Sequence, residues 1–211
     1  MADVKAGRMP LRRRQALETR RAIVRAARTL FAERGYATTS IELLAEEAGV
    51  AARTVYAVFG SKKGILGAIC EEWLIEAGVM EAVAEGLAVP DLGRRLQIVA
   101  RTSRRQWELE RGVRSLLEGA AASDAEVAKM LAGWKADRAR SLREVFTGVE
   151  DDLRPGIDLN RAGAILRALV GGEVYSELVA GEGWTPDQYE EWLGEVLAEL
   201  LLPPRRRSQT R

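Results

Sequence analysis

The sequence has no histidine and a single cysteine, Cys70. Without histidine the chain lacks the commonest proton shuttle near neutral pH, and one cysteine cannot form a disulfide within the chain. The same two shortages argue against a zinc site built from cysteine and histidine. We therefore expect no metal site, no cofactor and no need for an oxidising compartment.

Long apolar runs are also missing. No segment approaches the roughly 18 consecutive apolar residues that a membrane-spanning helix needs. The arginines at positions 12–14 are not followed by the apolar region of a signal peptide. We expect a soluble, cytoplasmic protein that does not act at a membrane.

Charge is almost balanced over the whole chain, at a net +1, but it is unevenly distributed. Residues 1–67 hold 13 Lys and Arg against 6 Asp and Glu, whereas the remainder is acidic overall. A basic segment joined to an acidic body is typical of a head that binds a polyanion. The alternative is a basic tail without a partner, because Lys5, Arg8 and the arginines at 12–14 supply five of these charges.

Apolar residues recur with a helical period almost throughout, and no alternating strand pattern persists. We therefore predict an all-α fold. Glycines, prolines and capping residues divide it into helices near 13–34, 39–48 and 51–58, a fourth that starts at Ser61 and runs towards Glu85, and later ones at 91–109, 111–121, 124–148, 158–180 and 185–202. Thr38 or Thr39 is expected to cap the second helix, with Glu42 completing a capping box if the cap is Thr39.

Residues 38–60 have the pattern of a helix-turn-helix, in which two short helices are joined by a tight turn. Ile41, Leu44, Ala45 and Ala48 bury the first helix, and Gly49-Val50 supplies the turn. The second helix is held by the apolar residues Val55, Val58 and Phe59. Its outer face is then free to enter the major groove of DNA, where projecting side chains reach base edges.

The run "RAARTLFAERGYATTSIELLAEEAGVAARTVYAVFGSKKGIL", residues 25–66, resembles the DNA-binding domain of TetR-type transcriptional regulators. The resemblance rests on Phe31, the Gly35-Tyr36 stop, Gly49-Val50, the 54–56 segment and the Ser61-Lys62 start of the next helix. It implies a three-helix DNA-binding domain followed by a helical ligand-binding and dimerisation domain. The expected divisions are a flexible basic arm at 1–12, the DNA-binding domain at 13–67, the second domain at 68–202 and a disordered tail at 203–211.

The resemblance also implies which residues contact a double-stranded DNA operator. Hydroxyls of Thr39 and Tyr56, and the ammonium of Lys62, would bind backbone phosphates, and Thr54 a phosphate or a nearby base edge. Arg53 is the candidate for guanine readout, and Ala51 and Ala52 for contact with thymine methyl groups.

This chain departs from the commoner family pattern at Ala51 and Ala57, so few polar side chains are left to read base edges. Specificity would then depend on Arg53, Lys63 and DNA shape. As alternatives, Tyr56 is a half-buried core aromatic, Arg53 a solvated surface charge and the two lysines plain exposed helix residues. The arginines at 12–14 either follow the minor groove or only aid solubility.

The last two predicted helices, 158–180 and 185–202, carry more apolar surface than one monomer core requires. Members of the resembled family dimerise through their last two long helices, so we expect a homodimer there. The alternative is that these faces form the intramolecular core. A dimer would present two heads to a palindrome with half-sites about one helical turn apart.

The middle helices are expected to bind a small, mostly hydrophobic effector, because few polar groups lie on their apolar stripes. The candidate lining residues are Trp107, Leu117, Met130, Trp134 and Tyr175, each of which is alternatively plain core. Coupling to the head is expected to run through the helix that begins at Ser61.

Together these features predict a transcriptional repressor that a ligand releases from DNA. The alternative within the same fold is a helical interaction module that has lost DNA binding. An enzyme is the other class that we considered. No spacing of carboxylates, serine or lysine in this chain indicates a catalytic site, so we expect none.

Overall fold

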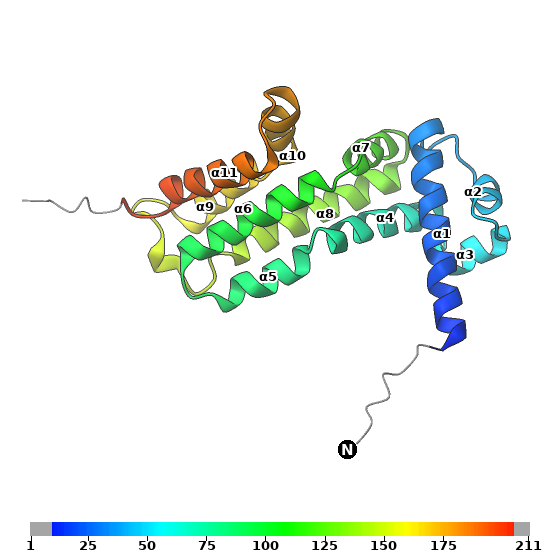
Figure 1. Cartoon of the computed structure of the whole chain (residues 1–211), viewed down its shortest axis with the longest axis horizontal. Helices are drawn as coiled ribbons and strands as arrows, with labels where there is room; N and C mark the ends of the chain where they lie inside the picture. The colour runs from blue at the N-terminus through cyan, green and yellow to red at the C-terminus, as the bar shows by residue number, and fades with distance from the viewer. Residues whose placement is uncertain (1–9, 205–211) are drawn as a thin grey trace, which may run out of the picture. The chain divides into compact units, whose positions relative to one another are not determined.

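The computed structural model describes residues 10–204 (Figure 1). Positions 1–9 of the predicted arm and 205–211 of the predicted tail lie outside the described residues. The described part is helical and contains no strand, which confirms the all-α prediction. Among these residues, no helix combines the length and the apolar character that crossing a membrane demands.

The chain forms two compact units. The first contains residues 10–71 and 112–129, and the second contains residues 72–111 and 130–204. The first unit therefore includes a segment far along the sequence in addition to the predicted DNA-binding domain. Two helices, α4 (Lys62–Glu76) and α8 (Ala125–Glu144), begin in the first unit and continue into the second.

The first unit is built on α1 (Leu11–Arg34), α2 (Ile41–Glu47), α3 (Ala52–Phe59), the start of α4, α7 (Val113–Ser123) and the first turn of α8. Because α1 starts at Leu11, the last two residues of the predicted arm are helical. Its inner face buries Ile23, Val24, Ala27, Leu30 and Phe31.

The end of α1 is defined by Gly35, which has a φ of 85° and whose N–H donates to the Phe31 carbonyl at 3.0 Å. The Thr38 hydroxyl contacts the carbonyls of Arg34 and Gly35, so this threonine serves the end of α1. The cap of α2 is Ser40, whose Oγ accepts from the Leu43 N–H at 3.1 Å. The prediction of a Thr38 or Thr39 cap with Glu42 in a capping box was therefore wrong by one residue.

A tight turn joins α2 to α3, as the sequence predicts. Gly49 has a φ of 67°, a conformation that costs glycine little and other residues more. The Val50 N–H donates to the Ala45 carbonyl at 2.9 Å and closes the turn. Val55 is fully buried and fastens α3 to the unit.

The junction between α3 and α4 is unusually close. Gly60 has a φ of 72° and ends α3, and Ser61 Oγ accepts from the Gly64 N–H at 3.2 Å, which confirms the predicted cap of α4. A Cβ placed on Gly64 would lie 2.0 Å from the backbone oxygen of Phe59. Only glycine at this position allows the first turn of α4 to lie against the last turn of α3.

The second unit contains the end of α4, α5 (Val79–Ala88), α6 (Leu92–Glu108), the rest of α8, a short 3-10 turn (Glu150–Asp152), α9 (Leu159–Leu169), α10 (Gly172–Tyr175), a π-helical segment η2 (Ser176–Gly181) and α11 (Pro186–Leu201). Two predicted helices were drawn too long. The helix from Ser61 ends at Glu76, because Gly78 adopts the left-handed conformation before α5.

The other correction concerns the predicted helix 158–180, which the structure breaks at Val170 and Gly171. The freed Val170 carbonyl accepts the Trp107 indole N–H at 2.9 Å and Arg138 Nη2 at 2.9 Å. A Cβ on Gly172 would lie 2.8 Å from the Trp107 ring. Gly172 therefore admits the indole. The two donors replace the helical hydrogen bond that the break gives up.

The core of the second unit lies between α6, α9 and α11. The Thr185 and Gln188 side chains form a capping box at the start of α11, and Pro186 occupies its first turn. Ser103 Oγ and Tyr189 Oη are 3.0 Å apart in this core. Its largest fully buried side chains are Leu92, Leu96, Phe146, Leu166, Tyr189, Leu193 and Leu197.

The contact at Gly64 gives a direct test of how α3 is held. We expect Gly64→Ala to destabilise the first unit by about 1–3 kcal/mol, because the added methyl group would overlap the Phe59 carbonyl. The measurement is denaturant unfolding followed by circular dichroism. Gly119→Ala in α7 is the control, since nothing lies within 4 Å of its Cβ position. Equal stability of the two variants would contradict the proposed role of Gly64.

Candidate nucleic-acid interface

The outer face of α3 is accessible to solvent. Ala51, Arg53, Tyr56 and Ala57 are exposed, and the Tyr56 side chain keeps 50% of its accessible surface. Ala52 and Thr54 are half-buried. The structure thus brings these predicted contact residues, from Ala51 to Tyr56, to one short helix.

The side chains of Arg53 and Tyr56 have no hydrogen-bond or ion-pair partner among residues 10–204. A guanidinium and a phenol hydroxyl without partners on a fixed helix are available to an external ligand. The interpretation of Tyr56 as a core aromatic therefore does not fit its exposure. Val58 also differs from expectation, because it is 39% exposed and does little to hold α3 down.

The start of α3 adds a second feature. Its N-cap residue is Ala51, which has no side-chain acceptor for the first N–H groups. The Thr54 N–H donates to the Ala51 carbonyl at 2.8 Å. The backbone N–H groups that precede Thr54 in the first turn have no side-chain cap, because Ala51 cannot supply one. Free amides at a helix start favour a negatively charged group.

Thr39 is a correction to the predicted phosphate contacts. Its side chain is 1% exposed, and its hydroxyl donates to the Gly35 carbonyl at 2.8 Å and approaches the Leu30 carbonyl at 3.4 Å. A phosphate offers only acceptors, and the one proton of this hydroxyl is already used within the protein. Thr39 therefore joins α1 to the start of α2 and does not belong to the exposed surface.

Lys62 is half-buried and turned towards the protein. Its Nζ donates to the carbonyls of Tyr36 at 2.8 Å and Ala37 at 3.4 Å, and lies 4.6 Å from the centre of the Tyr36 ring. Two of its three N–H groups are thus engaged, and one remains for a phosphate.

Lys63 is more accessible, but it is paired with an acidic residue from another part of the chain. Its Nζ lies 3.2 Å from a carboxylate oxygen of Glu126 at the start of α8. Sequence reasoning missed Glu126, because 63 positions separate the two residues. Both predicted lysines therefore have intramolecular partners when no DNA is bound.

Tyr36 and Asp124 were also missed as parts of this region. The Tyr36 hydroxyl donates to Asp124 Oδ2 at 3.4 Å. Burial, together with the nearby Asp124 carboxylate, raises the pKa of Tyr36 to about 12, so this phenol stays protonated at physiological pH. The sequence marks Tyr36 only as the residue after a helix-ending glycine.

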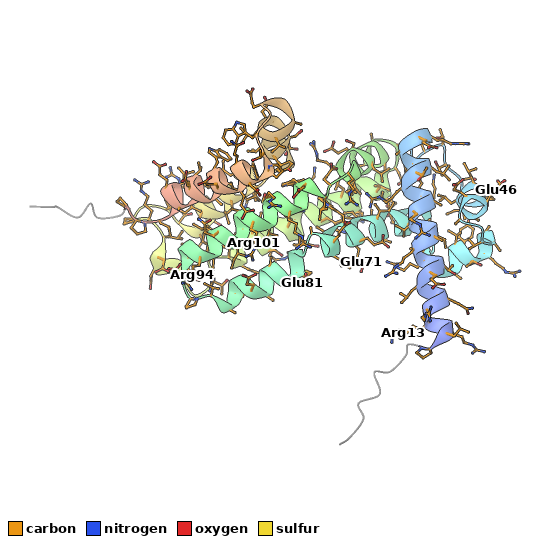
Figure 2. All side chains as sticks on the ribbon, viewed as in Figure 1. Arg13, Glu46, Glu71, Glu81, Arg94 and Arg101 are labelled. Carbon is orange, nitrogen blue, oxygen red and sulfur yellow. The ribbon has the colours of Figure 1, made fainter. Side chains whose placement is uncertain are left out.

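The first turns of α1 extend the basic surface. The arginines at 12–14 are exposed and helical, and Figure 2 shows Arg13 at the N-terminal end of α1. Arg20 is anchored by Glu71 at 2.8 Å, and its guanidinium lies 5.1 Å from the centre of the Phe59 ring at the end of α3. Through Arg20, the third turn of α1 supports the end of α3.

The predicted ligand residues do not form one group. Leu117 is buried in the first unit, whereas Trp107, Met130, Trp134 and Tyr175 are half-buried in the second. Leu117 is therefore core of the first unit, and its prediction as a lining residue does not fit. The Trp107 indole nitrogen is bound to Val170, and Tyr175 packs edge-on against Tyr189 with ring centres 4.9 Å apart.

Acidic and cysteine side chains do not gather into a metal site in the described part of the chain. No group of three or more such residues within residues 10–204 is close enough to hold a metal ion.

Comparisons with known proteins find a family match for part of the first unit. Residues 23–69 match the family model described as bacterial regulatory proteins, tetR family. The matched segment runs from the core of α1 through the helix-turn-helix to the middle of α4. Among curated proteins, none matches the chain by sequence.

Solved structures show that the likeness in fold extends to nearly the whole chain. NalD of Pseudomonas aeruginosa, the secondary repressor of the MexAB-OprM multidrug efflux pump, is 23% identical with a TM-score of 0.68, over 89% of this chain and 97% of its own. A transcriptional regulator from Saccharomonospora viridis in complex with choline is 22% identical with a TM-score of 0.64, over 88% and 98%.

A third structure, SmeT in complex with triclosan, is 21% identical with a TM-score of 0.70, over 87% of this chain and 91% of its own. At these identities the structures establish the fold alone. The chain is thus an all-α protein whose residues 23–69 match the tetR family of bacterial regulatory proteins.

Proposed function

We propose that this protein is a cytoplasmic transcriptional repressor that binds a palindromic DNA operator as a homodimer and is released by a small, mostly apolar ligand. The observation that carries the proposal is the outward face of α3. Arg53 and Tyr56 are exposed without internal partners on a helix that the buried Val55 and the close contact at Gly64 hold in place.

In this proposal α3 lies in the major groove. Arg53 reads a base edge, and guanine is its natural partner because a guanidinium can donate to both O6 and N7. Ala51 and Ala52 contact thymine methyl groups. Tyr56, Thr54 and Lys62 bind the phosphate backbone, which sets affinity and register without selecting a sequence. Lys63, predicted from the sequence to contribute to specificity, follows Lys62 at the start of α4 and is here assigned to the phosphate backbone as well.

The homodimer is supported by an apolar surface that the second unit leaves incompletely covered. On α11, Trp192 and Val196 are half-buried and Leu200 is 38% exposed, at successive spacings of four along one side of the helix. On α9, Ile165 and Leu169 are half-buried as well. Pairing these faces about a two-fold axis would bury them and place two heads on one duplex.

A small-molecule site in the second unit is supported by the packing of α8. Beyond its first turn, α8 carries five half-buried apolar residues: Met130, Leu131, Trp134, Ala139 and Leu142. Apolar surface that stays partly exposed suits an apolar ligand. Two proteins of the same fold were solved with a small molecule, SmeT with triclosan and the Saccharomonospora viridis regulator with choline, which supports a small-molecule site in this architecture.

In this proposal the ligand acts on DNA binding through α4. This helix starts beside α3 with Lys62 and continues into the second unit, where the Trp73 indole N–H donates to the Gln106 carbonyl at 2.8 Å. A ligand that binds one conformation of the second unit more tightly would shift the population of head arrangements.

Substitutions on α3 separate phosphate binding from base reading. Tyr56→Phe should weaken binding to all duplexes by a similar factor, because it removes one phosphate contact, whereas Arg53→Ala should cost about 1–3 kcal/mol at a single base pair. Competition binding with duplexes selected from a random pool measures both effects. If neither change alters DNA binding, α3 does not read the duplex as proposed; if the unaltered chain binds no duplex, the fold serves as an interaction module instead.

The dimer is tested by charging its proposed interface. We expect Val196→Arg to convert a dimer into a folded monomer, because the half-buried position tolerates a long side chain in the monomer but not between two packed α11 helices. Sedimentation equilibrium measures the mass and circular dichroism the fold. Glu191→Arg, at an exposed position of α11, should remain dimeric. A dimer in both variants would place the interface elsewhere.

A further inference from the structure

The two lysines at the start of α4 and the start of α8 form a connected set of charges within the first unit. Lys63 Nζ lies 3.2 Å from Glu126 Oε2. Lys62 lies over the ring of Tyr36, whose hydroxyl donates to Asp124. Each lysine proposed to bind a phosphate is therefore linked to a carboxylate of the α7–α8 junction.

The start of α8 is firmly placed in this unit. Asp124 caps the helix, with Oδ1 accepting from the N–H groups of Glu126 at 2.9 Å and Val127 at 3.3 Å. The Val127 side chain is fully buried. The backbone that carries Glu126 is thus fixed, even though the Glu126 side chain itself is 69% exposed.

We propose that Glu126 competes with the DNA backbone for Lys63, so that the start of α8 lowers the DNA affinity of the head. A phosphate that approaches Lys63 must displace the Glu126 carboxylate, and the loss of this ion pair opposes binding. This inference rests on the proposed function, since it concerns the same DNA surface.

The arrangement gives α8 a direct influence on the head. The helix that presents Glu126 continues into the second unit, where it carries Met130, Trp134 and Arg138. Arg138 fixes this part of α8, because its guanidinium donates to Gln106 Oε1 at 3.0 Å and to the Val170 carbonyl at 2.9 Å. A rearrangement of α8 in the second unit would alter the ion pair between Glu126 and Lys63.

The test compares Glu126→Gln with Glu46→Gln. Glu46 is exposed on α2, at the place labelled in Figure 2, and its side chain has no partner among the described residues. Both changes remove one negative charge from the first unit, but only the first frees Lys63. The probe is a fluorescein-labelled 30-base-pair duplex of mixed sequence, because phosphate contacts do not depend on sequence, and anisotropy is recorded between 20 and 200 mM KCl.

We expect Glu126→Gln to bind the duplex about two- to fivefold more tightly than Glu46→Gln at low salt, the range over which exposed ion pairs contribute. The slope of log affinity against log salt should also steepen by up to about 0.9 for each head, because Lys63 then neutralises a phosphate fully. Circular dichroism should show unchanged folding, since both side chains are exposed.

A double-mutant cycle with Lys63→Gln decides whether Glu126 acts through Lys63. In the Lys63→Gln background, Glu126→Gln should change the affinity no more than Glu46→Gln does. An equal effect of Glu126→Gln with and without Lys63, or no difference between the two glutamate variants, would overturn this inference alone. If the unaltered chain shows no salt-dependent binding to the duplex, the proposed function and this inference both fail.

Discussion

The position of α3 depends on packing against its neighbours, because an eight-residue helix has almost no stability of its own. Val55 supplies the buried anchor, and the Phe59 carbonyl lies against the Cα of Gly64 where any side chain would overlap. These two contacts fix one side of α3 and leave Arg53 and Tyr56 on the other. Without them the exposed residues would have no defined geometry to offer a duplex.

The first unit shows that the head extends beyond the helix-turn-helix. Residues 112–129 complete it with α7, whose Val113, Leu117 and Ala120 are buried, and with the start of α8. Asp124 reaches Tyr36 and Glu126 reaches Lys63 from this segment. The surface proposed to bind DNA is therefore shaped by residues that lie more than 60 positions away from the helix-turn-helix in the sequence.

Local signals in the sequence predicted much of the fold. Gly35, Gly49 and Gly60 end or connect helices as expected, and Ser61 caps α4. Such signals act through a few neighbouring residues, which is why they can be read without coordinates. The break at Gly171 was not predictable in this way, because it depends on Trp107 and Arg138, which are distant in sequence and satisfy the Val170 carbonyl.

The candidate site also combines features set by neighbouring residues, which could be predicted, with features that depend on residues distant in sequence, which could not. The exposure of Ala51, Arg53 and Tyr56 follows from helical periodicity around Val55 and was predicted. The burial of Thr39 was not, because its hydroxyl is used by carbonyls at the end of α1. The pairing of Lys63 with Glu126 was also missed, since only tertiary folding brings α8 to the start of α4.

We propose that α3 is fixed by packing on its inner side and that the two chains of a homodimer each present Arg53 to the same DNA duplex. This proposal is tested most directly by selecting the duplexes that the protein retains from a fully randomised pool and sequencing them. The account predicts an enriched inverted repeat whose halves are centred about one helical turn apart, or a multiple of it. Retained sequences without any repeat, or no enrichment over the starting pool, would contradict it.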